Sequence, residues 1–202
     1  GCTPLLRVGM FGGAFDPPHR AHMTLADTAL RQLGLDRLHV IPTGYAGHKT
    51  RELTPFVHRL AMTRLAFEAL DKVTVDPREG ERAGPSYTID TLVELKDLYP
   101  GAHLFLIVGE DQARSMASWH RATEIEKFAT ICVAARAGSI SAEARLNASS
   151  PGREGWQLLQ TPEMDISATD LRCRLAGGES VAPLVFEPVA RYIAHHHLYQ
   201  TA

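Results

Sequence analysis

Short apolar runs alternate along the chain with longer segments in which apolar side chains recur every three or four positions. The short runs are typical of buried strands, and the longer segments are typical of amphipathic helices. Six runs are expected to be strands: residues 5–11, 38–42, 73–76, 103–109, 130–136 and 156–160. Because strands and helices alternate, the pattern predicts right-handed βαβ units around a buried parallel sheet.

Three of the helical segments carry start or stop signals. The first ends at Gly34, where a left-handed cap conformation is expected. Thr54 and Pro55 supply an N-cap and a first-turn proline for the second helix. The third helix starts at Ser86 or Thr88. The second helix carries apolar side chains at helical spacing, namely Val57, Leu60, Ala61 and Leu65.

The C-terminal third of the chain is less regular. Residues 138–155 are polar and rich in Ser, Gly and Ala, so they are expected to form a loop or a frayed surface helix. Residues 185–199 predict a closing helix with Pro188 in its first turn and with its three consecutive histidines at the surface. The fold expected for residues 1–202 is therefore a single α/β domain, a Rossmann-like doubly wound parallel sheet with C-terminal helices.

Composition narrows the classes of function. The chain has 202 residues, of which 45% are hydrophobic, which is enough for one compact core. Its three cysteines, Cys2, Cys132 and Cys173, form no CxxC pair, which argues against a disulfide framework or a zinc ribbon and for a reducing, cytoplasmic compartment. No secretion signal or membrane-spanning run is expected. With a net charge of -2 and scattered Lys and Arg, a small-molecule partner is favoured over nucleic acid or a membrane.

The sequence GGAFDPPHRAH (residues 12–22) directly follows the first expected strand. Adjacent glycines let a ligand approach bare backbone, and ligands of open α/β sheets lie beyond the carboxyl ends of the strands. His19 and His22, three residues apart at the start of a helix, can donate hydrogen bonds into one cleft, which favours a phosphate ligand. Two alternatives stay open, a tight turn that needs only the bend and a zinc site, although two imidazoles are too few ligands for zinc.

A second motif lies near the C-terminus, where ISATDLRCRLAGG (residues 166–178) predicts a short helix. Ser167 and Thr169 open this helix, and Arg172 follows one turn later. Helix N-terminal amides, hydroxyls and a guanidinium together form an anion site that suits a polyphosphate. An ordinary capped helix is the alternative.

Together the two motifs resemble the GxFDPxHxxH and ISxTxxR motifs of the nucleotidyltransferase superfamily. Four further segments resemble bacterial nicotinate-nucleotide adenylyltransferases: IPTGYAGHK (41–49), GPSYTIDTL (84–92), LIVGEDQARSMASWHRATEI (106–125) and ARYIAHHHLY (190–199). The resemblance covers nearly the whole chain in the expected order. The chain departs from it at YAGHK, where many relatives have a Pro-Pro-His segment, and at His120, where a tyrosine is common.

The resemblance implies adenylyl transfer from ATP to nicotinate mononucleotide, with Mg²⁺ on the phosphates. The products are nicotinic acid adenine dinucleotide and pyrophosphate, in NAD biosynthesis, and a homo-oligomer is left open. A nucleotide 5′-phosphate is already an anionic nucleophile, so positioning and electrostatic stabilisation must supply the rate. Two rivals are pantetheine-phosphate adenylyltransferase, which has no counterpart to SYTIDTL, and a non-catalytic nucleotide sensor, which would not need His19, His22 and Arg172 together.

The resemblance also implies roles for individual residues, none of them as a metal ligand. Catalytic roles are implied for His19, His22, Lys49 and Arg172. ATP binding is implied for Gly12, Gly13, Asp16, Gly109, Asp111, Ile166, Ser167 and Thr169. Acceptor binding is implied for Phe15, Tyr87, Thr88, Trp119 and Arg136. For three of these residues another role stays open: Asp111 as a helix N-cap, Trp119 as a core residue and Arg136 as an exposed charge at the end of a strand.

Overall fold

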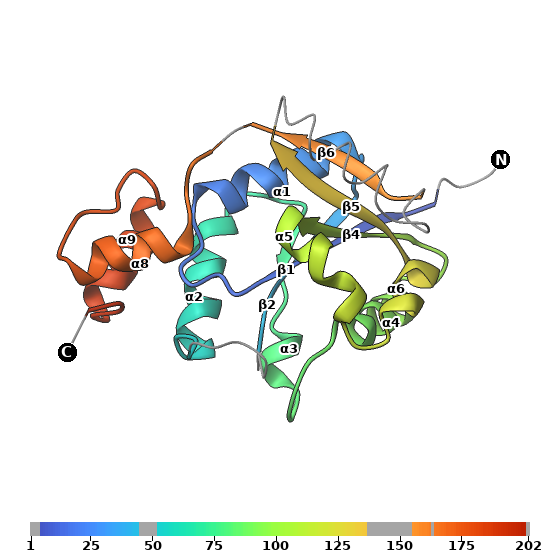
Figure 1. Ribbon diagram of the computed structural model, residues 1–202, viewed down its shortest axis with the longest axis horizontal. Helices are drawn as coiled ribbons and strands as arrows, with labels where there is room; N and C mark the ends of the chain where they lie inside the picture. Colours follow the sequence, from blue (N-terminus) through green and yellow to red (C-terminus); the bar gives the residue numbers. More distant parts are fainter. Residues whose placement is uncertain (1–4, 45–51, 137–154, 163, 201–202) are drawn as a thin grey trace.

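A computed structural model describes residues 5–44, 52–136, 155–162 and 164–200. Within these ranges six strands form one parallel sheet in the order β3-β2-β1-β4-β5-β6 (Figure 1). The strands are β1 (Arg7–Gly13), β2 (Arg37–Pro42), β3 (Val73–Val75), β4 (His103–Gly109), β5 (Ala129–Arg136) and β6 (Gln157–Thr161). All six expected strands are confirmed, and the bounds of β4 match the prediction.

The first strand is shifted along the sequence from its expected position. It starts at Arg7 rather than at Leu5, and the side chains of Leu5 and Leu6 are exposed. At its other end the strand continues through Gly12 and Gly13, which pair with β2. The glycines of the first motif are therefore part of the sheet, at the carboxyl end of β1.

Helices flank both faces of the sheet. They are α1 (Arg20–Gln32), α2 (Phe56–Phe67), α3 (Arg78–Glu81), α4 (Thr88–Leu98), α5 (Glu110–Ser115), α6 (Ala122–Phe128), α8 (Ala168–Ala176) and α9 (Glu187–His195), with a 3₁₀ turn, η1 (Met116–Ser118). The expected start at Thr88, the left-handed conformation of Gly34 and the position of Pro188 in the first turn of the last helix are confirmed. Residues 137–154, which cover nearly all of the segment expected to be a loop or frayed helix, lie outside the described residues.

Two hydrophobic clusters cover the two faces of the sheet. Phe11 of β1 belongs to a cluster with buried side chains of α1, α2, α8 and α9. Met10, its neighbour in the strand, belongs to a second cluster with side chains of α4, η1 and α6. Because successive side chains of a strand point to opposite faces, the two clusters lie on opposite sides of the sheet. This arrangement confirms the doubly wound α/β fold.

The start of the second helix differs from the prediction. Thr54 is not its N-cap, because α2 begins at Phe56 and its cap residue is Pro55. The main-chain N–H of Thr54 donates instead to Oδ2 of Asp16, at 3.1 Å. The buried face of α2 differs as well, since Val57 is 65% exposed. The buried residues of this helix are Arg59, Met62, Thr63, Ala66 and Phe67.

The C-terminal helices gather at one end of the molecule beside α2 (Figure 1). The hydroxyl of Tyr192 on α9 lies 2.8 Å from Nδ1 of His58 on α2 and ties the two helices together. The expected closing helix is shorter than predicted and leaves the last histidines in a turn. In the described part of the chain, every helix is too short or too polar to cross a membrane.

Candidate active site

The candidate site lies where β1 and β4 are neighbours in the middle of the sheet. The chain winds outward from these two strands in opposite directions, which makes their carboxyl ends the topological switch point where open α/β sheets bind ligands. The glycines Gly12 and Gly13 end β1, and Gly109 ends β4. The first motif therefore lies at the switch point, as its place after the first strand predicts.

At two of these glycines, Gly12 and Gly109, the packing of the protein does not require the absence of a side chain. A Cβ on Gly12 would lie 3.7 Å from the main-chain oxygen of Ile41, and a Cβ on Gly109 would meet no protein atom within 4 Å. Neither residue has a positive φ. Because the fold itself would accept a side chain at both positions, close approach of a ligand to the backbone is the remaining advantage of glycine there.

The two histidines of the first motif lie together at the start of α1. His19 is the N-cap residue and is 5% exposed, and its ring stacks on that of His22 with the centroids 3.8 Å apart. The main-chain N–H of His19 donates to Nδ1 of His22, at 3.1 Å. In the neutral form of His22 the proton is therefore on Nε2, which remains a donor.

Burial keeps both imidazoles uncharged. Desolvation lowers the pKa of His19 to about 4. Burial, together with the neighbouring His19, lowers the pKa of His22 well below its usual range. Nδ1 of His19 is also buried without a hydrogen-bond partner among the described residues. An orphaned buried polar atom is costly, so a ligand that completes its hydrogen bonding would be stabilised here.

The residues between the glycines and the histidines point into the protein. Phe15 has a positive φ of 49° and its ring, 1% exposed, packs against Phe11 and Phe67. Its side chain is therefore part of the core, so an acceptor could meet only its main chain. The carboxylate of Asp16 accepts hydrogen bonds from the N–H of Thr54 and the hydroxyl of Tyr199. Asp16 thus ties the loop to two other segments, and its contact with ATP stays a prediction.

The late motif reaches the first motif through Arg172 on α8. Its Nη1 donates to the main-chain oxygen of Asp16 at 2.8 Å, and its Nη2 donates to Oγ1 of Thr169 at 3.1 Å. Ser167 caps the helix by accepting from the N–H of Asp170, at 3.1 Å. Ile166 packs against the core cluster that contains Phe11 and is not fully buried. The structure therefore brings the two motifs of the predicted phosphate site into contact.

A buried arginine that the sequence analysis missed joins the loops after β1 and β2. Arg59 on α2 is 2% exposed. Its guanidinium donates to four main-chain oxygens, namely those of Thr54 (2.6 Å), Ala14 (3.1 Å), Thr43 (2.6 Å) and Gly44 (3.4 Å). The only signal in the sequence was a charged residue within an otherwise uncharged helical stripe, at positions 59, 62, 63, 66 and 67.

An open cavity of about 590 Å³ adjoins the switch point at the ends of β4, β5 and β6, and Gly109, Asp111 and Thr161 are among its lining residues. This volume lies within the usual range for small-molecule sites. Asp111 is not the N-cap of α5, because that position belongs to Gly109. The exposed carboxylate of Asp111 pairs with Arg114 and lies at the cavity.

Two of the residues predicted to bind the acceptor lie at the start of α4. Tyr87 is the N-cap residue and Thr88 begins the helix. The ring of His120 stacks on that of Tyr87 with the centroids 4.2 Å apart, a contact that the sequence could not indicate. Trp119 is partly buried against the second core cluster, and its Nε1 donates to Oγ of Ser115 at 3.3 Å. Trp119 is therefore partly a core residue.

Two predicted site residues cannot be placed in full. Lys49 lies outside the described residues. Arg136 ends β5 opposite Thr161 of β6, but its side chain is outside the described part of the structure. Their contacts with phosphate stay predictions.

Comparison with known proteins agrees with this geometry. A family model described as cytidylyltransferase-like matches residues 10–174, a range that contains the first motif and also Ser167, Thr169 and Arg172 of the second. The protein "Probable nicotinate-nucleotide adenylyltransferase" of Albidiferax ferrireducens is 58% identical over 196 residues, which cover 97% of this chain and 99% of that protein. The chain belongs to the nicotinate-nucleotide adenylyltransferase family.

Other members of the family and a solved structure extend the comparison. The protein of the same name from Methylibium petroleiphilum is 42% identical over 205 residues, covering 98% of this chain and 94% of that protein. The Plasmodium falciparum nicotinic acid mononucleotide adenylyltransferase complexed with NaAD has a TM-score of 0.78 at 19% identity, covering 96% of this chain and 97% of that chain. The structural likeness confirms the nucleotidyltransferase fold.

Replacing Arg59 by methionine should destabilise the protein strongly. The substitution leaves buried carbonyl oxygens without donors, and each unsatisfied group costs about 1 to 3 kcal/mol, so we expect a loss of at least about 3 kcal/mol. Urea unfolding measures the difference. Arg64→Met, at an exposed position of the same helix, is the matched control and should stay within about 0.5 kcal/mol of the parent protein. Equal effects of the two substitutions would contradict the role of Arg59.

The free energy of unfolding without ligand should fall as the pH drops from 6.5 towards 4. The pKa of His19 is about 6.5 in the unfolded chain and about 4 in the folded protein, so the unfolded chain binds more protons in this window. The contribution of His19 to the free energy of unfolding is therefore complete above pH 6.5. One such group changes the free energy of unfolding by at most about 1.4 kcal/mol per pH unit. Urea unfolding across this range should give a flatter profile for His19→Gln, whereas the exposed control His195→Gln should leave it unchanged. An unchanged slope in His19→Gln would refute the assignment.

Proposed function

We propose that the protein transfers the adenylyl group of ATP to nicotinate mononucleotide, forming nicotinic acid adenine dinucleotide and pyrophosphate in NAD biosynthesis. The observation that carries the proposal is the contact of Arg172 with the main chain of Asp16, because it joins two anion-binding motifs at the switch point of the sheet. The identity to relatives named for this activity supports it. The names of these relatives argue against the pantetheine-phosphate alternative.

The reaction needs no nucleophilic side chain. An oxygen of the acceptor's 5′-phosphate attacks the α-phosphorus of ATP, a new P–O bond forms, and the bond to the β-phosphate oxygen breaks with its electron pair leaving on pyrophosphate. Negative charge builds up on the transferring group and the leaving group, so hydrogen-bond donors fixed in advance lower the barrier. His19 and His22 are suited to this work as buried neutral donors.

Arg172 and Ser167 would hold the leaving β- and γ-phosphates at the start of α8. The guanidinium of Arg172 is already oriented by Asp16 and Thr169, so little reorganisation is needed when the triphosphate binds. The adenosine would then extend to the cavity beside Gly109. Placing these groups before the reaction converts a bimolecular encounter into an aligned one.

The acceptor base would lie at the start of α4. Main-chain N–H groups of Tyr87 and Thr88 and the positive end of the helix dipole favour a carboxylate over a neutral amide. The stacked rings of Tyr87 and His120, with Trp119 next in sequence, provide aromatic surface for a pyridine ring. This part of the site would choose between nicotinate and nicotinamide.

Mg²⁺ is part of the proposal as a companion of the ATP phosphates. Residues 5–44, 52–136, 155–162 and 164–200 contain no group of three or more His, Cys, Asp or Glu side chains arranged to hold a metal ion. An ion that arrives on the triphosphate and keeps most of its water, as Mg²⁺ commonly does, would not require such a group. When bound, Mg²⁺ supplies neutralisation of phosphate charge.

The proposal also includes a cytoplasmic location and a single domain over residues 1–202. Cys132 and Cys173 are both free thiols, which suits a reducing compartment. ATP and nicotinate mononucleotide are the expected partners, with no nucleic acid and no membrane.

A panel of acceptors tests the proposed function. With ATP and Mg²⁺, nicotinate mononucleotide should release pyrophosphate with a kcat/KM about 30- to 1000-fold above that of nicotinamide mononucleotide, because the carboxylate gains roughly 2 to 4 kcal/mol after its desolvation cost. Phosphopantetheine is the control acceptor and should give no pyrophosphate. Equal values for the two pyridine mononucleotides would rule out the helix-terminus pocket, and activity with phosphopantetheine alone would move the protein to the rival family.

Replacing His19 by alanine should lower kcat by about 10²-fold, because the lost donor acts on charge that develops in the transition state. Steady-state kinetics at saturating ATP and acceptor measure the effect, and far-UV circular dichroism checks that the fold is kept. His195→Ala, at an exposed position of α9, should keep the parent kcat. Normal turnover in His19→Ala would remove His19 from the mechanism.

A further inference from the structure

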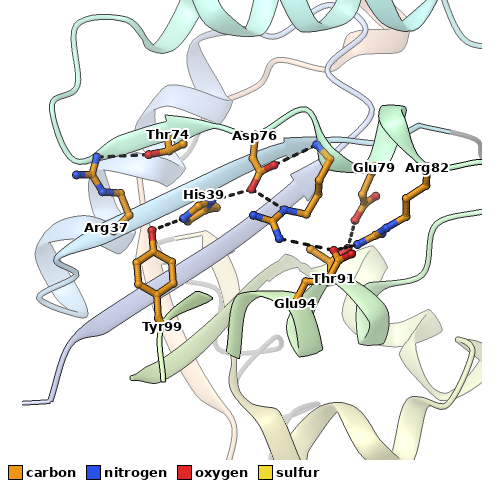
Figure 2. A network of polar contacts seen from close by, with 10 residues as sticks. Arg37, His39, Thr74, Asp76, Glu79, Arg82, Thr91, Glu94 and Tyr99 are labelled. Carbon is orange, nitrogen blue, oxygen red and sulfur yellow. Dashed lines mark hydrogen bonds and ion pairs between the residues drawn. The ribbon is translucent and has the colours of Figure 1, made fainter. Parts of the chain in front are cut away.

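A buried carboxylate outside the phosphate site holds the start of α4 from two sides. Glu79 lies on the short helix α3 and is 8% exposed. Its Oε2 accepts a hydrogen bond from the hydroxyl of Thr91, at 2.8 Å (Figure 2). Its main-chain oxygen accepts from the hydroxyl of Ser86, at 3.0 Å. Ser86 precedes Tyr87 and Thr88, and Thr91 follows them, so both flanks of the first turn of α4 are attached to one residue.

The hydroxyl of Thr91 acts as both donor and acceptor in this network. It donates to Glu79 and accepts from Nη1 of Arg82, at 2.9 Å, while the residue itself is completely buried. Arg82 also forms an ion pair with Glu94, one turn farther along α4. Burial raises the pKa of Glu79, and the nearby charge of Arg82 opposes this increase. A buried polar network of this kind fixes one arrangement only when each member is satisfied.

The network continues from α4 to the edge of the sheet (Figure 2). Arg78 donates through Nε to Oδ2 of Asp76, at 2.8 Å, and lies 3.6 Å from Glu94. Asp76 also contacts Nδ1 of His39 on β2, and Nε2 of His39 lies 2.8 Å from the hydroxyl of Tyr99, directly after α4. Both ends of α4 are thus connected through polar side chains to the sheet.

Helix α3 is also packed tightly against the loop after β2 and against Phe56, the first residue of α2. A Cβ on Gly44 would lie 2.1 Å from the main-chain oxygen of Glu79, and a Cβ on Gly80 would lie 2.2 Å from the ring of Phe56. Because α3 is fixed against this loop, loss of the contacts of Glu79 with Ser86 and Thr91 would let the start of α4 move relative to the loop. Among the residues assigned to ATP, Gly109 and Asp111 and those at the start of α8 belong to other elements and make none of these contacts.

We propose that Glu79, acting through Thr91 and Ser86, is a positioning residue that sets where the first turn of α4 meets the acceptor, and that it determines acceptor affinity without touching substrate. The inference rests on the proposed function, because it takes the N–H groups of Tyr87 and Thr88 as the contacts of the nicotinate carboxylate. Loss of the contact lets the helix terminus shift, which weakens acceptor binding and leaves ATP binding intact.

Thr91→Val tests the proposal, because valine keeps the shape of threonine and loses the hydroxyl. We expect KM for nicotinate mononucleotide to rise about tenfold, with KM for ATP and kcat within about twofold of the parent. Thr91→Ser keeps the hydroxyl and should return the acceptor KM to within about threefold. Thr28→Val is the matched control: Thr28 is a buried helical threonine whose hydroxyl has no partner among the described residues, and all three constants should stay unchanged.

Ser86→Ala is the second variant and makes the smaller change, in a loop. It removes the other contact of Glu79 and should raise the acceptor KM about threefold or more, again without changing KM for ATP. Parallel increases in both KM values, or an unchanged acceptor KM in Ser86→Ala, overturn the proposal. A parent protein that is active with nicotinate mononucleotide while its variants show no split refutes only the positioning role. A parent protein without this activity refutes the proposed function, and the inference with it.

Discussion

The geometry of the candidate site depends on the hydrogen bonds that the buried guanidinium of Arg59 donates. Loops at the carboxyl ends of parallel strands present carbonyl oxygens that neither sheet nor helix satisfies, and burying such groups without partners is costly. Arg59 supplies donors to the loops after β1 and β2 and to the segment before α2. A buried charge is also costly when it lacks hydrogen-bond acceptors. The Arg59 cation and the loops therefore stabilise each other in one conformation. Ala14, one of the residues that Arg59 holds, directly follows Gly12 and Gly13 of the first motif.

The sheet could be predicted from the sequence because strands buried on both faces are short, almost uninterrupted apolar runs. The buried face of α2 could not be predicted in this way. Hydrophobic periodicity selected Val57, which is exposed, and passed over Arg59, because the pattern ranks residues by polarity and a hydrogen-bonded buried arginine breaks that ranking. The same limit hid Glu79, whose carboxylate is buried only because Thr91 donates to it.

Much of the candidate site could also be predicted, because its two motifs are local and parallel topology sends strand ends to one edge. The directions of the side chains could not be predicted from the sequence. Phe15 looked available to a substrate, yet its positive φ turns the ring into the core. The stack of His120 on Tyr87 joins the turn before α6 to the N-cap of α4, 33 residues apart, so no local pattern could reveal it. Local motifs predicted the chemistry, and long-range packing decided which side chains are buried and which are exposed at the candidate site.

The contacts of Asp16 join parts of the chain that are synthesised at very different times. Its partners Arg172 and Tyr199 lie 156 and 183 residues later in the sequence. Contacts with such separation form late in folding, because the intervening loop must be closed first. During synthesis the first motif leaves the ribosome long before the residues that brace it. The loop that carries Asp16 is therefore fixed in place only after Arg172 and Tyr199 have been added to the chain.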